Sequence, residues 1–311
     1  MKQILEPLEN FYKQKRTLCF SSVGSFKYPY TKLVRQSLPA MTKIISKVTD
    51  VVQVIRLYEM SYVVVWTVDN VADEGEINAG RDHLTSMIQF LNSDRHPQNH
   101  SETILQYIFD AAALSGRDVE AIRIAFENIF QCVALDTMRR HKCFDGTPEL
   151  WSQEDVERYV YQMEFDGIFK LIFELFGENT HDFKRFWPIV HAGRLHFYLL
   201  RDVVEDISQG LINVPKEFLP NDIHTLIQAC KELEKKKDKN MHERIKKIKN
   251  LTNQFPEIEQ WVTIQIREGQ RLLTESRQVS QRGLQLRTKI LLHGSRRRTQ
   301  KFFKQASKGL L

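Results

Sequence analysis

Apolar residues recur at helical spacing along almost the whole chain, and this pattern leaves little room for a fold that is not all-helical. The run from Tyr62 to Trp66 has the β-branched and aromatic residues of a buried strand, but no second run of that quality exists to pair with it. We therefore predict an all-α protein. Turn chemistry separates the periodic stretches at 93–99, 145–148, 177–179 and 213–220.

Three helices can be placed from this pattern. One continuous helix is predicted from about Lys43 to Leu91. The stretch Ile168–Phe176 (IFKLIFELF) is apolar on most of its circumference, which predicts a central core helix. A third helix is predicted over Ile189–Ser208, because Pro188 suits a first helical turn and Gly210 suits a helix end.

The composition is that of a folded globular protein, and we expect a cytoplasmic one because the sequence shows neither a spanning segment nor the apolar core of a secretory signal. Of its 311 residues 42% are apolar and 27% charged, which is ordinary for one large folded domain and excludes a wholly disordered chain. No stretch approaches the ~20 apolar residues of a spanning helix. The four cysteines form no CxxC pair, so we expect reduced, packed thiols at Cys19, Cys132, Cys143 and Cys230.

The basic residues are concentrated at the end of the chain. The net charge is +6, but ten Lys or Arg residues and no acid follow Glu275, so residues 1–275 carry −4. We expect a helical domain at 1–275 and a basic amphipathic helix or tail at 276–311. Such a segment gains about 1 kcal/mol per basic residue near an anionic bilayer, and its Phe and Leu residues suit the interface. This favours a peripheral membrane contact over nucleic acid, with a merely solvated tail nearly as good an interpretation.

Two acidic motifs stand on predicted helices. The first runs from Asp69 to Glu74 (DNVADE) and the second from Asp202 to Asp206 (DVVED). Each places two aspartates four residues apart on one helix face, where like charges destabilise an isolated helix by roughly 0.2–0.5 kcal/mol. Apolar residues precede both motifs, and a hard divalent cation such as Mg²⁺ would offset the repulsion. Spacing alone is weak evidence, because carboxylates four apart also arise by chance among 39 acids.

The second motif carries a family resemblance. The stretch Leu199–Pro215 (LLRDVVEDISQGLINVP) resembles the second aspartate-rich motif of squalene and phytoene synthases. In the family's order, Asp69–Glu74 resembles its first motif, Asp136 its mid-chain acid and Trp151–Tyr161 (WSQEDVERYVY) its Tyr-x-Tyr helix. The resemblance covers roughly residues 50–220, and the second motif is its most specific part.

The resemblance implies one large antiparallel bundle of the isoprenoid synthase type with a central apolar pocket. It implies a transferase that uses two or three Mg²⁺ ions to ionise a farnesyl or geranylgeranyl diphosphate-like substrate and build a larger isoprenoid. Arg201 would contact the diphosphate or brace the acids, and Tyr159 and Tyr161 would be catalytic. The implied metal ligands are Asp69, Asp73, Glu74, Asp202, Glu205 and Asp206.

Aromatic faces are the expected shield for the allylic carbocation, at about 0.5–2 kcal/mol each. For any single aromatic residue, plain core packing is the more frequent role. The candidates by position are Tyr62, Trp66, Tyr159, Tyr161, Phe165 and Tyr198.

Several positions depart from the family pattern. Trp66 stands where the family commonly has an arginine, and Leu195 and Tyr198 replace a Gln-x-x-Asn pair. The acids remain, while residues that shape a two-substrate pocket have changed. Two alternatives therefore stay open: a terpene cyclase that acts on one substrate, and a catalytically inactive family member that serves as a binding or assembly protein.

Overall fold

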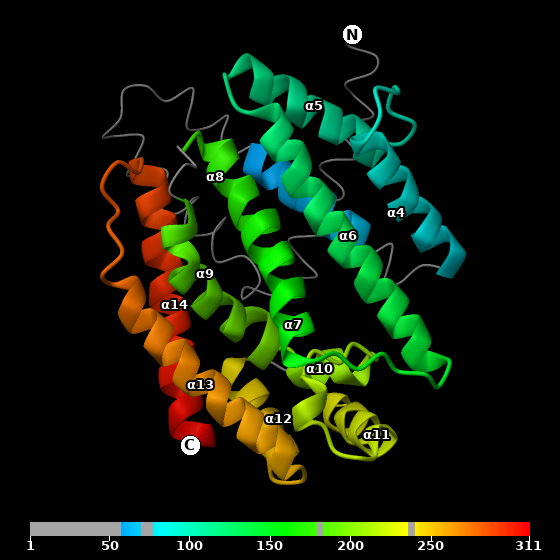
Figure 1. Cartoon of the computed structure of the whole chain (residues 1–311), viewed down its shortest axis with the longest axis vertical. Coiled ribbons are helices and arrows are strands. Elements are labelled where there is room, and N and C mark those ends of the chain that lie inside the picture. The colour runs from blue at the N-terminus through cyan, green and yellow to red at the C-terminus, as the bar shows by residue number, and fades with distance from the viewer. Residues whose placement is uncertain (1–56, 70–76, 179–182, 236–239) are drawn as a thin grey trace. The chain divides into compact units, whose positions relative to one another are not determined.

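The computed structural model describes residues 57–69, 77–178, 183–235 and 240–311, and within these ranges all regular structure is helical (Figure 1). The prediction of an all-α protein is therefore confirmed for the described residues. No helix in these ranges combines the length and apolar character needed to cross a membrane. After a helical segment at 57–69, the elements in chain order are α4 (Ile77–Leu91), α5 (His100–Leu114), α6 (Val119–Phe144), α7 (Gln153–Val160), η1 (Tyr161–Phe169), α8 (Lys170–Phe176), η2 (Phe183–Phe186), α9 (Trp187–Arg194), η3 (Leu195–Leu200), α10 (Val203–Ser208), η4 (Lys216–Phe218), α11 (Ile223–Glu234), α12 (Met241–Thr252), α13 (Pro256–Ser276) and α14 (Leu286–Leu310).

The chain divides into two compact units. The first contains the described residues up to Ala134, together with Asp166–His181 and Gly283–Gly294. The second contains Leu135–Phe165, Asp182–Arg282 and Ser295–Leu311. The long helices α6 and α14 each contribute residues to both units.

Aromatic packing forms the core of the first unit. The ring of Phe126 lies 6.2 Å from Phe109 and 5.9 Å from Phe130, and Tyr58 meets Phe176 edge-on at 6.2 Å. Every residue from 171 to 176 is buried, which confirms the core helix predicted from the apolar stretch at 168–176. The same unit confirms that the run at 62–66 is helical, while 43–56 and 70–76 of the predicted long helix lie outside the described residues.

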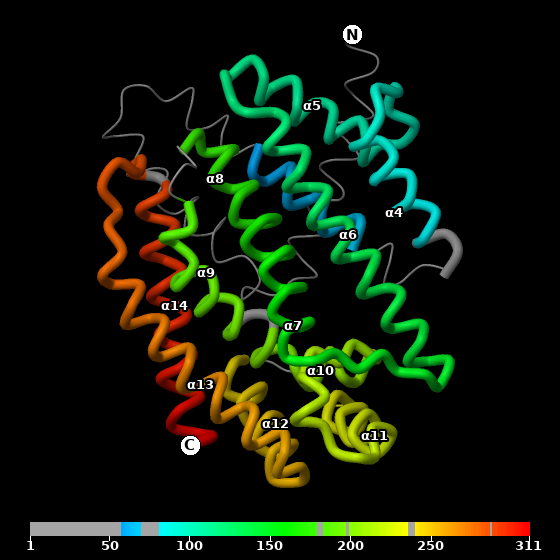
Figure 2. The backbone as a smooth tube through the Cα atoms, viewed as in Figure 1, coloured from blue at the N-terminus to red at the C-terminus, as the bar shows by residue number. Residues whose placement is uncertain are grey.

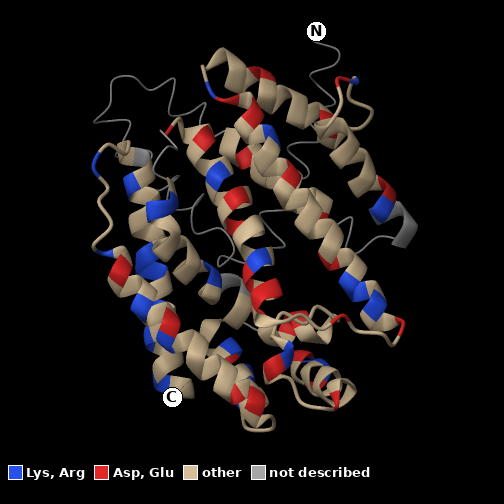
Figure 3. Cartoon of the chain, in the orientation of Figure 1, with Lys and Arg blue, Asp and Glu red and all other residues tan. Residues whose placement is uncertain are grey.

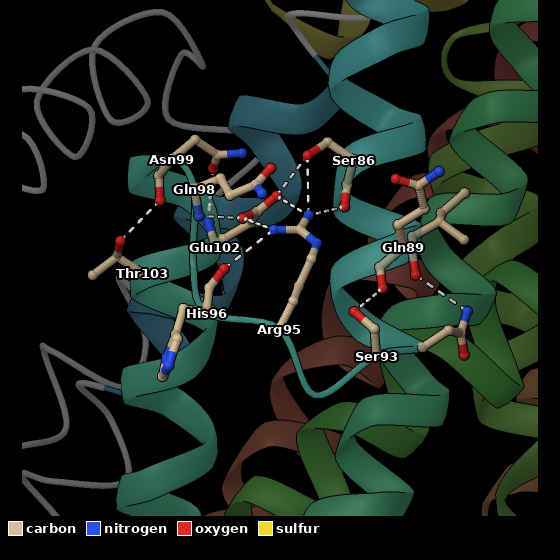
Figure 4. Close-up of polar contacts among 11 residues, drawn as sticks. Ser86, Gln89, Ser93, Arg95, His96, Gln98, Asn99, Glu102 and Thr103 are labelled. Atoms are coloured by element: carbon tan, nitrogen blue, oxygen red, sulfur yellow. Dashed lines mark hydrogen bonds and ion pairs between the residues drawn. The ribbon is translucent and has the colours of Figure 1, made fainter.

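A buried carboxylate ties α4 to α5 in the first unit (Figure 4). Glu102 is fully buried and accepts hydrogen bonds from Nη1 and Nη2 of Arg95, at 2.8 and 2.7 Å. It also accepts hydrogen bonds from the Ser86 hydroxyl and the Gln98 backbone N–H. Burial alone would raise the pKa of the Glu102 carboxyl, but these donors hold it below its usual value. These hydrogen bonds give the buried Glu102 carboxylate a structural role, which is to join α4 to α5.

In the second unit, α9 packs along α13, and α10 packs against α11 and α12 (Figure 1). The carboxyl-terminal part of α14 lies on α13, with the ring of Phe303 so close to Gly269 that a Cβ added there would come within 2.0 Å of it. The neighbouring ring of Phe302 stacks on His196 at 4.0 Å. The Phe residues of this segment were predicted to suit a membrane interface, but Phe302 and Phe303 are both buried in the fold.

The helix predicted over 189–208 is not one regular α-helix (Figure 2). It begins as predicted, with Pro188 in the first turn of α9, and Gly210 follows it with a φ of +83°. Between them η3 is π-helical, and the backbone bends at Arg201 and Asp202 before α10 begins. The Arg201 N–H donates to the carbonyl of His196, five residues back, instead of four. The prediction was wrong here because the turn is wider than an α-helical turn.

Three cysteines bear out the expected packing. Cys132, Cys143 and Cys230 are buried and form no disulfide, while Cys19 lies outside the described residues. Burial, together with the negative charge of Glu234, raises the pKa of the Cys230 thiol to about 12. This thiol therefore stays protonated and behaves as a small apolar side chain.

Candidate functional site

The carboxylates of the second motif gather in the second unit, where α10 starts. Asp202 is the residue before α10, and its carbonyl accepts the N–H of Asp206 at 2.8 Å, so the two aspartates are stacked one turn apart as predicted. Asp136 of α6 is close enough for its charge to raise the pKa of Asp206. We refer to Asp136, Asp202, Glu205 and Asp206 as the acidic cluster.

Two arginines hold the Asp202 carboxylate. The Nε of the adjacent Arg201 donates to Oδ1 at 2.8 Å, and its Nη2 donates to Oδ2. Arg244, which comes from α12, donates from Nη1 to the same Oδ1. The Nη2 of Arg244 also lies 3.4 Å from an oxygen of Glu205. Arg201 therefore braces the acids, one of the two roles predicted for it.

Asp206 is placed where negative charge accumulates. Burial, followed by the charges of Asp202 and Glu205, raises the pKa of its carboxyl well above the usual range. Arg140 opposes this shift and Asp136 adds to it. Burial and the neighbouring carboxylates thus disfavour the ionised form of Asp206 more than Arg140 favours it.

Tyr159 connects α7 to the acidic cluster. Its hydroxyl donates to Oδ2 of Asp136 at 2.5 Å, and its ring packs 5.2 Å from that of Trp151. The Ser152 side chain caps the start of α7 and so fixes where the helix presents this tyrosine. The structure therefore brings the predicted residue Tyr159 to the acidic cluster.

Arg139 is the buried support beneath the cluster. Its side chain is 1% exposed, its Nη1 donates to the Asn213 amide oxygen at 2.8 Å, and its Nη2 donates to the carbonyl of Ile212. The guanidinium also lies 3.4 Å from the ring centre of Trp151 and 3.7 Å from Asp136. Burial lowers the pKa of Arg139 despite the nearby acids. This one side chain links α6 to the segments before α7 and after α10.

Tyr161 lies in a different environment from Tyr159. Its ring packs 5.0 Å from Phe165 and 4.9 Å from Trp187, and Phe165 in turn packs 4.4 Å from Phe183. His191 stacks on Trp187 at 4.6 Å, and burial lowers the pKa of this imidazole to about 3. Tyr161 is therefore part of an aromatic cluster with a neutral histidine, and its predicted catalytic role stays a prediction.

The first acidic motif is described only at its start. Asp69 is the last residue of the helical segment at 57–69 and is partly exposed in the first unit, while Asp73 and Glu74 lie outside the described residues. Tyr62 and Trp66 are partly buried in the same segment, and the side chain of Tyr198 is not described. The role of Asp69, Asp73 and Glu74 as metal ligands stays a prediction.

The donor chemistry of the acidic cluster suits a hard cation. Carboxylate oxygens are the ligands Mg²⁺ prefers in proteins. Within the described ranges, however, no three His, Cys, Asp or Glu side chains are gathered closely enough to hold a metal ion. In this arrangement the arginines supply the positive charge at Asp202 and Glu205.

Sequence reasoning missed three basic residues of this site. Arg139 and Arg140 follow Asp136 by three and four residues on α6, a spacing that signals a shared helix face. Arg244 lies 42 residues from its partner Asp202, and nothing in the sequence links the two. Its position depends on how α12 packs against α10.

The exposed side of α14 is a basic stripe. Arg297, Lys301, Lys304 and Lys308 are all exposed and recur at spacings of three and four residues, which places them on one helix face. Figure 3 shows Lys and Arg along this helix. With Phe302 and Phe303 buried, this face can attract an anionic surface by charge but not by inserting those rings.

Comparison of the chain with protein families, with curated proteins and with solved structures gives no match. The residues described above therefore carry the functional argument alone.

Proposed function

We propose that the protein is a Mg²⁺-dependent enzyme of the squalene and phytoene synthase type that ionises a prenyl diphosphate. The observation that supports this most is the convergence of Asp136 from α6 with Asp202, Glu205 and Asp206 around α10, with Tyr159 bonded to Asp136. These residues come from three separate motifs of the family resemblance: the mid-chain acid, the Tyr-x-Tyr helix and the second acidic motif. Their convergence in one unit is what a shared site requires.

The proposed reaction begins with cleavage of the allylic C–O bond. The electron pair leaves with the diphosphate oxygen, and the carbon becomes an allylic cation. Bound Mg²⁺ would act as a Lewis acid that stabilises the leaving diphosphate. In the second unit, Asp202, Glu205 and Asp206 would hold the ions, and Arg201 would keep Asp202 oriented. A later step must add a second prenyl unit or release a proton.

The Tyr161 cluster suits the hydrocarbon part of such a substrate. Tyr161, Phe165 and Trp187 offer aromatic faces that attract a carbocation by about 0.5–2 kcal/mol each. The half-buried His191 keeps its imidazole neutral near neutral pH, so it adds no positive charge there. Both properties agree with chemistry that passes through a cation.

The direct test is incubation of the purified protein with farnesyl or geranylgeranyl diphosphate and Mg²⁺. We expect release of inorganic diphosphate that stops when the metal is chelated. No release from either substrate would reject the enzyme proposal. Mass spectrometry of the products would separate coupling of two prenyl units from cyclisation of one, which is the closest alternative.

A binding or assembly role is the second candidate, and the arginines that already neutralise Asp202 favour it. A ligand that binds only the native state must raise the thermal midpoint. A non-hydrolysable prenyl diphosphate analogue with Mg²⁺ should therefore raise the midpoint of the enzyme proposed here. An unchanged midpoint together with an absence of turnover would favour the assembly role.

We also propose that the basic stripe of α14 contacts an anionic membrane surface. Changing Lys301 and Lys304 to Glu should weaken co-sedimentation with phosphatidylserine vesicles by at least about tenfold, since each basic residue contributes about 1 kcal/mol near such a surface. The matched control changes Lys246 and Lys249 of α12, which are also exposed, to Glu. Equal loss in both variants, or tighter salt-dependent binding to nucleic acid than to vesicles, would contradict membrane contact.

A further inference from the structure

Arg194 is a buried arginine of the second unit that takes no part in the acidic cluster. It is the last residue of α9 and is 1% exposed, and its Nη2 donates to the carbonyl of Val156 at 3.1 Å. Its Nε and Nη1 are buried and have no hydrogen-bond partner. Among the described residues, no carboxylate forms an ion pair with it. Buried donors without acceptors destabilise a fold, so two of them on one charged side chain indicate a missing partner.

The surroundings of Arg194 compensate its charge only in part. Burial lowers the pKa of the guanidinium to about 9, although the charges of Glu164 and Glu157 oppose this shift. These acids act on Arg194 through space and do not accept its unbonded donors. Burial, and then the charge of Arg194, lowers the pKa of His191, three residues earlier on α9. A positive charge in such a place favours the approach of an anion.

Arg139 shows how a structural arginine of the same unit differs. Its Nη1 and Nη2 both donate to oxygens of the protein. Its guanidinium also lies over the ring of Trp151 and 3.7 Å from Asp136. Arg194 has only the contact with the carbonyl of Val156. Support of the fold therefore explains Arg139 but leaves most of the Arg194 guanidinium unexplained.

The backbone around Arg194 is π-helical on two segments. Arg194 directly precedes η3, and Glu164, the acid with the largest effect on its pKa, lies in η1. Wide turns of this kind are frequent at functional sites. Because the guanidinium is buried, a ligand reaches it only through a local opening of the surrounding helices. Bound ligand should therefore hold these segments closed.

We infer that Arg194 is an anion-binding residue, whose Nε and Nη1 donate to the oxygens of a diphosphate group. The two nitrogens face different edges of the planar guanidinium, so one oxygen cannot accept from both. A diphosphate carries acceptor oxygens on two phosphorus atoms and suits charge-assisted bonds from arginine. The choice of diphosphate rests on the proposed function, whereas binding at Arg194 needs neither a metal ion nor the acidic cluster.

The test is calorimetric titration of the full chain with inorganic diphosphate in the presence of EDTA. Arg194→Met should bind diphosphate at least about tenfold more weakly than the unaltered protein, because the charged donor is lost. Arg194→Lys keeps the charge without the planar guanidinium, so its affinity should lie between the two. The matched control is Arg158→Met, which removes an exposed arginine of α7 paired with Glu154 and should leave binding unchanged.

Stability and hydrogen exchange separate a binding role from a structural one. Without ligand, Arg194→Met should keep or raise the midpoint of thermal unfolding, because it removes a buried charge that is only partly compensated. Diphosphate should slow hydrogen exchange of the backbone amides at 187–200 in the unaltered protein but not in Arg194→Met. Repeating the titration with a non-hydrolysable prenyl diphosphate analogue shows whether an attached hydrocarbon adds affinity.

Two results would overturn the inference: no binding of diphosphate by the unaltered protein, or equal binding by Arg194→Met. If Arg194→Met does not fold, unchanged binding by Arg194→Lys would contradict it instead. Release of diphosphate from farnesyl diphosphate and Mg²⁺ alongside any of these results would leave the proposed function standing. A tenfold loss of diphosphate binding in Arg194→Met, with no release by the unaltered protein, would support the anion site and reject the enzyme.

Discussion

Replacement of Asp206 by asparagine is expected to reduce diphosphate release at least about 100-fold, the loss typical when one preorganised electrostatic group is removed from an active site. Asparagine has nearly the same shape but cannot neutralise a cation. The fold should tolerate the change, because burial and the charges of Asp202 and Glu205 already disfavour the ionised form of Asp206, and asparagine is neutral. The midpoint of thermal unfolding should therefore stay the same or rise while turnover falls. Steady-state release of inorganic diphosphate and differential scanning calorimetry measure the two quantities.

This opposite response distinguishes a functional carboxylate from a structural one. The control is Asp110→Asn, an exposed residue of α5 whose change should alter neither turnover nor stability. A variant at Asp206 that kept more than about half of the activity would remove this residue from the proposed metal ligands. A large fall in stability would show that the carboxylate is needed for folding, as Glu102 is expected to be.

The sequence predicts helices best where residues within the helix itself decide its burial or its ends. The stretch at 168–176 is apolar on nearly all sides, so any folded chain must bury it, and the structure does so. The run at 62–66 is predicted to be helical because no second strand exists to pair with it, and the structure shows a helix there. Pro188 and Gly210 likewise act through their own backbones and mark the limits of their segment correctly.

The sequence fails where packing between distant segments decides the geometry. The wide turn before Arg201 involves His196, whose ring is stacked on Phe302 more than a hundred residues later. No local pattern encodes that contact. Arg244 is a similar case, since only the packing of α12 on α10 brings it to Asp202. The acids of the site were predictable from their spacing, while the arginines that neutralise them mostly were not.

The largest effect on stability is expected from Arg139→Met. Removing one partner of a buried ion pair typically costs about 3–5 kcal/mol, because the other charge loses its compensation. Here the change also removes the donors to Asn213 and Ile212 and the contact with the Trp151 ring. Urea denaturation followed by circular dichroism should show a much lower midpoint with a similar dependence on urea. Arg158→Met provides the control, since its pair with Glu154 is exposed and should contribute no more than about 0.5 kcal/mol.

The role of Arg139 can be resolved further with a second substitution. Arg139→Lys keeps a positive charge near Asp136 but loses the planar guanidinium that donates to Asn213 and Ile212. Its stability should therefore lie between that of Arg139→Met and that of the unaltered protein. A double-mutant cycle with Trp151→Leu isolates the contact with the ring, which we expect to contribute about 0.5–2 kcal/mol. If Arg139→Met unfolded at the same urea concentration as Arg158→Met, the buried arginine would not be the support of the acidic cluster. The placement of Asp136 against Asp206 would then need another explanation.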